Sequence, residues 1–255
     1  MLFEAKTLEN YSICSLNGEI GKAKEFYFDD HHWTVRYLVA DTGKWLTDNK
    51  VLLSPYSLNG VSQVEKCISV NLTKKQIEKS PPLGSDKPVS RQFEREYYKY
   101  YKWPEYYMGV SVWGGSPLLV FSNETKKERK QAEESWDPHL RSTRDVSGYM
   151  IQALDGEVGC IDDFIIDDKT WQIRYLIVNT QDWWPGKRIL VSPQWIEKVN
   201  WGDAKIFVNI LREPFKSLPE YTMEAMLTRE YECQLYEGCN RQGYWSEETA
   251  DKKQP

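Results

Sequence analysis

Residues 26–46 read FYFDDHHWTVRYLVADTGKWL, and residues 164–184 read FIIDDKTWQIRYLIVNTQDWW. An offset of 138 residues relates the two stretches, and the match runs without a gap from residue 16 to residue 55, with 16 identities in 40 positions. A long gapless self-match indicates internal duplication. Two copies are too few for a solenoid, so we predict two similar domains in tandem.

Each copy has the pattern of several short strands. The first turn carries Asn17-Gly18 in copy one and Asp155-Gly156 in copy two, dipeptides typical of tight two-residue hairpins. Paired aspartates then favour a second turn at residues 29–32, because aspartate side chains accept hydrogen bonds from nearby backbone amides. About five or six strands per copy are enough for a small barrel, and closure would remove exposed sheet edges.

Short helices are predicted after the strands. Thr73 and Gln76 form a capping-box pattern, and Pro214 lies where a first helical turn tolerates proline. A second helix is predicted to begin near Ser90 in copy one and near Thr228 in copy two. The duplication therefore extends through the helices.

The predicted fold class is all-β with helical tails, namely two homologous small β-barrels in tandem, each followed by short helices. Interleaved acids and bases with few apolar residues favour a solvated linker between the copies. The predicted domains are a first barrel at 1–80, its helical and aromatic-rich tail at 81–121, a charged linker at 122–147, a second barrel at 148–213, and a helical tail with a disordered end at 214–255.

Both copies contain Leu-Asn/Asp-Gly-Glu-Ile/Val-Gly, Phe-x-x-Asp-Asp, Trp-x-x-Arg-Tyr-Leu and a strand ending in Ser-Pro. Together these motifs resemble the PRC-barrel family, specifically its bacterial members with two tandem barrels. The resemblance implies a small all-β barrel of the kind found in the photosynthetic reaction-centre H subunit and in a ribosome-maturation factor. It also implies docking into larger assemblies rather than catalysis. The signature residues are Gly18, Asp29, Asp30, Trp33, Arg36, Tyr37, Gly156, Asp167, Asp168, Trp171, Arg174 and Tyr175.

The amino-acid composition excludes some classes of partner and location. The net charge is −5, from 33 basic and 38 acidic residues, so the chain lacks the basic excess that phosphate neutralisation requires, and a nucleic-acid partner is not expected. Apolar runs are too short to cross a membrane, so no membrane insertion is expected. Five cysteines without a Cys-x-x-Cys pair favour reduced thiols in a cytoplasmic protein, with neither a disulfide framework nor a zinc site.

Most of the signature residues have structural interpretations. Hydrogen bonding within a turn explains the paired aspartates with fewer assumptions than a cation site does, so no metal or cofactor is predicted. Arg36 is predicted to pair with Glu25 across the hairpin, with anion binding as the alternative. Arg174 is predicted to pair with Asp163 in the same way. The repeated tryptophans favour packing, with a ligand pocket as the alternative.

Catalysis is not expected. The chain has three histidines, and His31 and His32 are replaced by Lys169 and Thr170 in copy two, so no histidine position repeats. A Cys-His dyad has no support from the spacing. We therefore predict that the protein is not an enzyme.

Residues 97–107, YYKYYKWPEYY, have the most unusual composition, with seven Tyr or Trp in eleven positions. Such side chains are frequent anchors at protein interfaces. Stacking on single-stranded RNA and packing of this segment on its own barrel are the alternatives. The predicted contact residues are Tyr97, Tyr98, Tyr100, Tyr101, Trp103, Tyr106, Tyr107 and Trp113.

The leading functional hypothesis is a non-enzymatic adaptor or scaffold that binds a protein partner. Self-association into a homo-oligomer is a further possibility for the partner. The alternative hypothesis is a small-molecule or RNA binding module that uses the barrel mouth. An assembly role like that of the reaction-centre H subunit or the ribosome-maturation factor is a more distant one.

Overall fold

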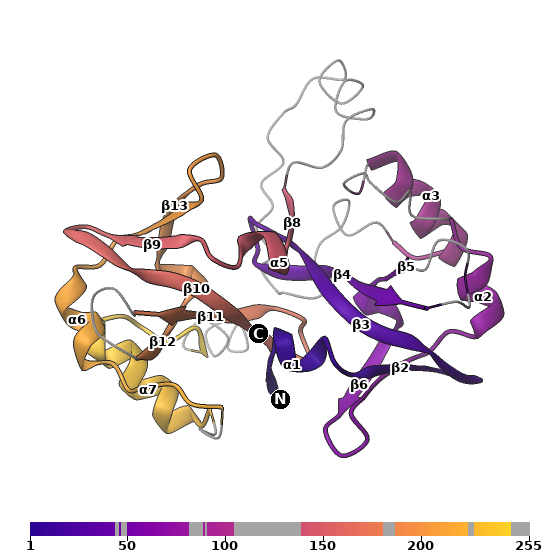
Figure 1. The fold of residues 1–255 in the computed structure, drawn as a ribbon, viewed down its shortest axis with the longest axis horizontal. Helices are drawn as coiled ribbons and strands as arrows, with labels where there is room; N and C mark the ends of the chain where they lie inside the picture. Colours follow the sequence, from indigo (N-terminus) through magenta and orange to yellow (C-terminus); the bar gives the residue numbers. More distant parts are fainter. Residues whose placement is uncertain are drawn as a thin grey trace, which may run out of the picture. The chain divides into compact units, whose positions relative to one another are not determined.

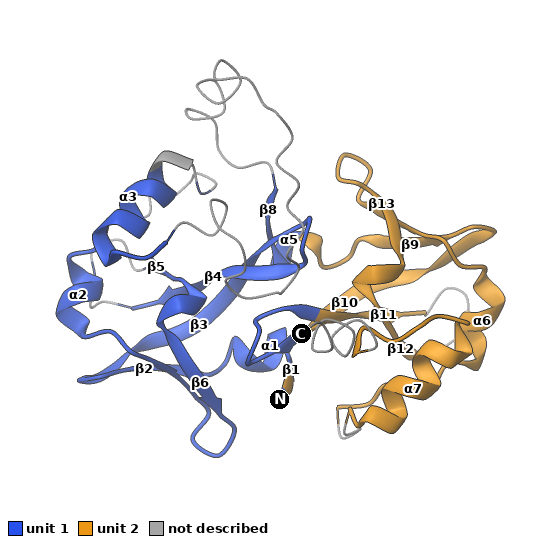
Figure 2. Ribbon diagram, turned by 180° about the vertical axis from the view of Figure 1, so that it is seen from behind, with its two compact units in different colours: residues 1, 3–145, 166–173 blue, residues 2, 146–165, 174–255 orange. Residues whose placement is uncertain are grey.

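A computed structural model describes residues 1–43, 46, 50–81, 89, 91–104, 139–180, 187–223 and 227–245. The chain divides into two units (Figure 2). Unit 1 comprises Met1, residues 3–145 and residues 166–173, whereas unit 2 comprises Leu2, residues 146–165 and residues 174–255. Linker residues 122–138 and the expected disordered end, 246–255, lie outside the described residues.

Unit 1 contains a mixed seven-stranded sheet with the order β5-β4-β3-β2-β7-β6 and with β8 added on β3 (Figure 1). Strands β2 and β7 are parallel, and the other neighbours are antiparallel. In the described part of the chain the pairing runs from β5 to β6 without joining these two ends, so no closed barrel is formed. The strands are β2 (Ser12–Ser15), β3 (Gly18–Asp29), β4 (Thr34–Asp41), β5 (Lys50–Leu53), β6 (Leu58–Ser62), β7 (Cys67–Val70) and β8 (Leu140–Ser142).

The second sheet repeats this topology, with the order β12-β11-β10-β9-β14-β13 and with β1 added on β10. Two similar mixed sheets in tandem agree with the predicted internal duplication, although the ladders of the described residues again stay open where a barrel was expected. The strands are β1 (Leu2–Glu4), β9 (Met150–Ala153), β10 (Gly156–Asp167), β11 (Ile173–Asn179), β12 (Arg188–Val191), β13 (Ile196–Asn200) and β14 (Lys205–Val208).

The structural repeat begins earlier than the sequence match. Strand β8 and helix α5 (Thr143–Val146) correspond, at the same offset of 138, to β1 and α1 (Ala5–Leu8). Residues 140–146, assigned to the charged linker from composition, are therefore a strand and a helical turn. One identity in seven positions, Leu2 with Leu140, marks this region in the sequence.

Short helices follow each sheet, as predicted. Thr73 caps α2 with the expected capping box: its side chain accepts from the Gln76 amide, and the Gln76 side chain accepts from the Thr73 amide. Thr228 caps α7 by accepting from the Tyr231 amide. Each Ser-Pro pair opens a 3-10 turn. The bounds are α2 (Lys74–Glu78), α3 (Arg91–Tyr101), α6 (Arg212–Ser217), α7 (Arg229–Gly238), η1 (Pro55–Ser57) and η2 (Pro193–Trp195).

The first hairpin of each copy is confirmed, with its turn one residue earlier than predicted. Ser15 pairs with Gly18, so the two-residue loop is Leu16-Asn17 rather than Asn17-Gly18. Gly18 has a φ of 125° where it begins β3. A second glycine, Gly21, is required by close approach, because a Cβ there would lie 2.0 Å from the carbonyl oxygen of Asp41.

The helix after each sheet is joined to it by a repeated buried polar network. The Tyr37 hydroxyl donates to Glu94 on α3 at 2.7 Å in unit 1. In unit 2 the equivalent Tyr175 hydroxyl donates to Glu232 on α7 at 2.6 Å. Because all four side chains are buried, hydrogen bonds from protein groups such as these tyrosines replace the ones that water would supply to each carboxylate. In each unit the network thus joins the helix that follows the sheet, α3 or α7, to the equivalent strand, β4 or β11.

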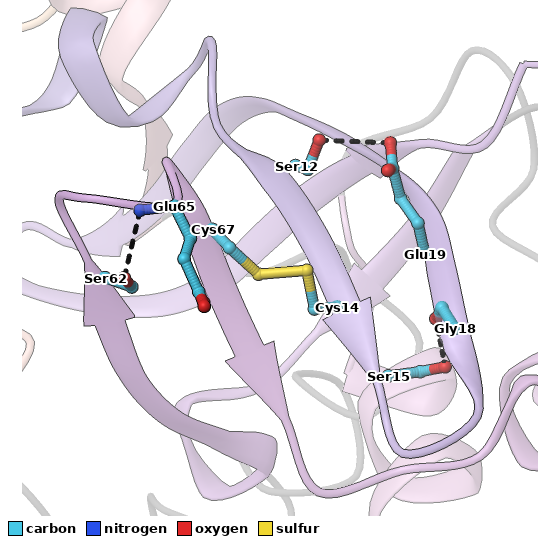
Figure 3. The surroundings of a disulfide bond; sticks show 8 residues. All are labelled: Ser12, Cys14, Ser15, Gly18, Glu19, Ser62, Glu65 and Cys67. Atoms are coloured by element: carbon cyan, nitrogen blue, oxygen red, sulfur yellow. Dashed lines mark hydrogen bonds between the residues drawn. A yellow bond between two sulfur atoms is a disulfide. The ribbon is translucent and has the colours of Figure 1, made fainter.

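A disulfide joins Cys14 on β2 to Cys67 on β7, with Cα atoms 6.3 Å apart (Figure 3). This finding corrects the expectation that the thiols are all reduced. The two cysteines lie 53 residues apart and become neighbours only when β2 and β7 pair in parallel. Disulfides are rare in a reducing cytosol, so the cysteine content no longer supports a cytoplasmic location.

Candidate interaction surface

Helix α3 carries the first half of the aromatic segment and buries two of its tyrosines. Tyr97 and Tyr98 are 1% and 0% exposed and pack with Tyr37. The Tyr97 hydroxyl donates to the Leu52 carbonyl at 2.8 Å and accepts from the Ser54 amide at 3.1 Å. These two side chains anchor the helix to the sheet, so they are inaccessible to a partner.

The next aromatic residues form one wall of a cavity of about 490 Å³, which we call the aromatic cavity. The Tyr101 and Trp103 rings are stacked, with centroids 4.4 Å apart and planes at 12°. Tyr100 stands edge-on to Tyr101 at 4.8 Å, and its hydroxyl donates to the Gln76 carbonyl. The cavity is lined by Asn71, Leu72, Gln76, Tyr100, Tyr101, Lys102 and Trp103.

The position of this wall follows from the local chain. Helix α3 ends at Tyr101, and Lys102 takes a left-handed φ of 59°, which turns the chain so that the Trp103 amide donates back to the Tyr98 carbonyl. The indole of Trp103 then stacks on Tyr101 and also on Tyr56 at 5.8 Å. Sequence reasoning missed Tyr56, although its place directly after the Ser-Pro motif was a usable signal.

Chemically, the aromatic cavity is suited to binding rather than to acid-base catalysis. Its lining has two side-chain amides and a single charged group, the exposed Lys102. Burial raises the pKa of Tyr101 to about 12, so its hydroxyl stays protonated at neutral pH. The remaining predicted contact residues, Tyr106, Tyr107 and Trp113, lie outside the described residues.

The turn interpretation of the first aspartate in each pair is confirmed. Asp29 accepts from the amides of His31 and His32 at 2.8 and 3.2 Å, and Asp167 accepts from the Lys169 amide at 3.0 Å. Burial opposes ionisation of Asp29, but the hydrogen bond from His32 and the charge of Arg36 outweigh it and hold the pKa of this carboxyl well below its usual value. These aspartates therefore organise their hairpins.

The predicted partner of Arg36 needs correction, whereas the pairing of Arg174 with Asp163 stays a prediction. Arg36 donates to Asp29 at 3.0 Å rather than to Glu25, which lies opposite Val39 in the β3–β4 ladder. A bulge between Tyr27 and Phe28 makes Arg36 the extra residue of the ladder and shifts the register from the one assumed for a regular hairpin. In unit 2 the guanidinium of Arg174 lies 4.4 Å from the Tyr244 ring centroid, a cation–π contact.

Two of the four repeated tryptophans pack, as predicted, whereas Trp45 and Trp183 lie outside the described residues. Trp33 is 7% exposed and stacks on Phe28 with centroids 5.2 Å apart. Trp171, which belongs to unit 1, is 4% exposed and lies 6.5 Å from Phe26. Both tryptophans take left-handed backbone angles, with φ of 49° and 56°. They close the second hairpin of each copy.

Comparison with known proteins identifies no family: no family model matches the chain, and no curated protein matches its sequence. The PRC-barrel resemblance therefore stands on the motifs alone. Among the described residues, no helix combines the length and the apolar character needed to cross a membrane.

Proposed function

We propose that this protein is a non-enzymatic adaptor and that unit 1 binds an extended segment of a partner protein in the aromatic cavity. The observation that carries the proposal is the stacked pair of Tyr101 and Trp103 beside the exposed Tyr100. Rigid aromatic side chains lose little conformational entropy on binding and supply large contact areas, which is why they dominate protein interfaces. The PRC-barrel resemblance supports the same class of function.

The lining predicts the chemistry of the segment. Tyr101 and Trp103 offer a surface for an apolar side chain, and Lys102 offers a positive charge at its edge. The side-chain amides of Asn71 and Gln76 supply donors and acceptors for a peptide backbone. We therefore expect an apolar residue flanked by a carboxylate.

The internal duplication favours a site in one copy only. Copy two has Gly238, Cys239 and Arg241 where copy one has Tyr100, Tyr101 and Trp103. The buried side of the helix differs less between the copies, since Tyr236 occupies the position that matches Tyr98 and is also buried. The difference between the copies is thus concentrated at the cavity wall.

A peptide-display selection on the purified full chain tests the proposal. We expect apolar peptides with an acidic neighbour to be enriched. We also expect Tyr100→Ser and Lys102→Glu each to weaken the best peptide by about tenfold, or about 1.4 kcal/mol, the scale of a contributing residue below the hot-spot range. Trp103 is left intact because it also packs on Tyr56 and Tyr97. Val64→Ser, which removes an apolar side chain that is 95% exposed in the same unit, is the control.

Failure to enrich any peptide would refute the proposal, as would equal binding by the two cavity variants and the control. Enrichment of oligonucleotides by the same protein, with loss in Lys102→Glu, would support the RNA-binding alternative instead. Circular dichroism of each variant checks that the fold is retained.

A further inference from the structure

Unit 1 brings together Asp30, His31 and His139, three metal-ligating side chains from segments more than 100 residues apart in the sequence. One ligand atom from each lies within 4.8 Å of the other two. His31 belongs to the hairpin between β3 and β4, and His139 immediately precedes β8. The sequence did not reveal this cluster, because the pairing of β8 with β3 creates it.

Backbone hydrogen bonds hold the cluster in place. The β3–β8 ladder pairs Asp29 with Leu140, and it continues as the Asp30 amide donates to the His139 carbonyl at 2.9 Å. On the other side, the His31 amide donates to the Asp29 carboxylate at 2.8 Å. Both imidazoles are therefore carried by hydrogen-bonded backbone.

The separation of the two imidazole nitrogens fits two ligands of one ion, although the rings, whose centroids lie 4.0 Å apart, must rotate for both lone pairs to meet at it. The Nε2 atoms of His31 and His139 lie 3.3 Å apart. Two nitrogen ligands at about 2.0–2.1 Å from a tetrahedral Zn²⁺ are separated by about 3.3–3.4 Å. Asp30 Oδ1 lies 3.2 Å from His139 Nδ1. A proton on Nδ1 directed at this carboxylate places the lone pair of the ring on Nε2, the usual carboxylate–histidine–zinc arrangement.

We propose that His31 and His139 bind a divalent transition ion, with Zn²⁺ as the representative, through their Nε2 atoms, and that Asp30 is the positioning residue for His139. Imidazole nitrogen suits zinc, copper and nickel rather than magnesium or calcium. Asp30 is in turn held by Arg141, whose Nε lies 3.3 Å from its Oδ2. Two protein ligands leave the other coordination positions to water or to a group from a partner.

Copy two supplies an internal comparison. At the equivalent positions, Asp168 is kept, Lys169 replaces His31 and Met1 replaces His139. The amino group of Met1 contacts the Asp168 carboxylate. Only copy one therefore places two imidazoles beside this aspartate.

Titration of the ¹⁵N-histidine-labelled full chain with ZnCl₂ tests this site directly, because the chain has three histidines and the third is a built-in control. The His32 Nδ1 lies 3.0 Å from Asp29, so His32 is committed to the hairpin. We expect the Nε2 signals of His31 and His139 to shift together to saturation at one ion per chain, while the signals of His32 stay in place. Binding at the free cysteines would leave all three imidazoles unchanged.

Variants separate the ligands from the positioning residue. His31→Gln and His139→Gln should each abolish saturable binding at this site, whereas His32→Gln should keep the affinity within about twofold. Asp30→Asn should weaken Zn²⁺ by about 10–100-fold, as loss of an outer carboxylate does, while both Nε2 signals still shift at high Zn²⁺. Asp168→Asn is the matched control for loss of a hairpin carboxylate and should leave the Zn²⁺ affinity unchanged.

Unshifted Nε2 signals of His31 and His139 at saturating Zn²⁺ would overturn the proposal. Equal shifts of all three histidines, or unchanged affinity in His31→Gln and His139→Gln, would do the same. The pair would then be an imidazole–imidazole hydrogen bond, with one Nε2 donating to the other.

Discussion

Removing the hydroxyl of Tyr175 tests whether the buried tyrosine–glutamate network holds the helix to its sheet. The hydroxyl donates to Glu232 Oε1 at 2.6 Å, both side chains are buried, and Tyr244 and Arg229 are the other partners of this carboxylate. A hydrogen bond to a charged group contributes about 1.5–3 kcal/mol. Because Glu232 keeps its two other partners, we expect Tyr175→Phe to lower the free energy of unfolding by about 1.5–2 kcal/mol.

A double-mutant cycle with Glu232→Leu, which removes the acceptor oxygens, isolates this interaction from the other effects of each substitution. Urea unfolding followed by tryptophan fluorescence gives the free energies, and the coupling should be about 1 kcal/mol or more. Tyr37→Phe, the equivalent change in unit 1, should cost a similar amount. Tyr149→Phe is the control, because its hydroxyl makes a 3.5 Å contact with the Trp201 carbonyl and is only partly buried. A coupling near zero would refute the structural role of the network.

Three further predictions concern unit 1. Thiol titration of the unfolded chain without reductant should detect three thiols, since Cys14 and Cys67 are bonded, and a count of five thiols would refute the bond. Reduction of the disulfide should cost about 4 kcal/mol of stability by the chain-entropy relation for a 53-residue loop. Gly21→Ala should lower stability by about 1–3 kcal/mol in urea unfolding, because the added Cβ meets the Asp41 carbonyl; an unchanged midpoint would contradict this. Burial and then the charge of Glu25 raise the pKa of Tyr27 to about 12. The contribution of Tyr27 to stability is therefore complete below pH 10 and is lost as the pH rises from 10 through 12. Absorbance at 295 nm measures the titration of Tyr27 and unfolding at each pH measures the stability; titration of Tyr27 at pH 10 in the folded protein would contradict the prediction.

Local chemistry explains which features the sequence predicted. The capping box at Thr73 and the aspartate turn at Asp29 depend on residues within three positions of each other, so the pattern alone identified them. The shifted Arg36 partner was missed because a β-bulge changes the register without a marker in the sequence. The closed barrel was likewise expected from strand count, whereas the ladders of the described residues have free ends at β5 and β6.

Features that depend on long-range pairing were not predictable in this way. The disulfide needs β2 beside β7, and the Asp30–His139 contact needs β8 beside β3. The aromatic segment falls between these cases. Its composition marked the region as unusual, but the buried positions of Tyr97 and Tyr98 depend on how α3 packs on the sheet. The sheet buries these two adjacent tyrosines together.

The duplication offers a means of separating structural residues from functional ones within a single chain. Positions that both copies keep, such as the buried tyrosine and glutamate of each helix contact, have roles that any copy of this fold needs. Residues that only copy one has are not needed by the fold in general, because copy two forms the same sheet without them. The wall of the aromatic cavity and the imidazole pair of His31 and His139 are both of this kind, and both lie in unit 1. This asymmetry predicts that variants at the two proposed sites impair binding with little loss of stability, whereas variants in the shared network do the reverse.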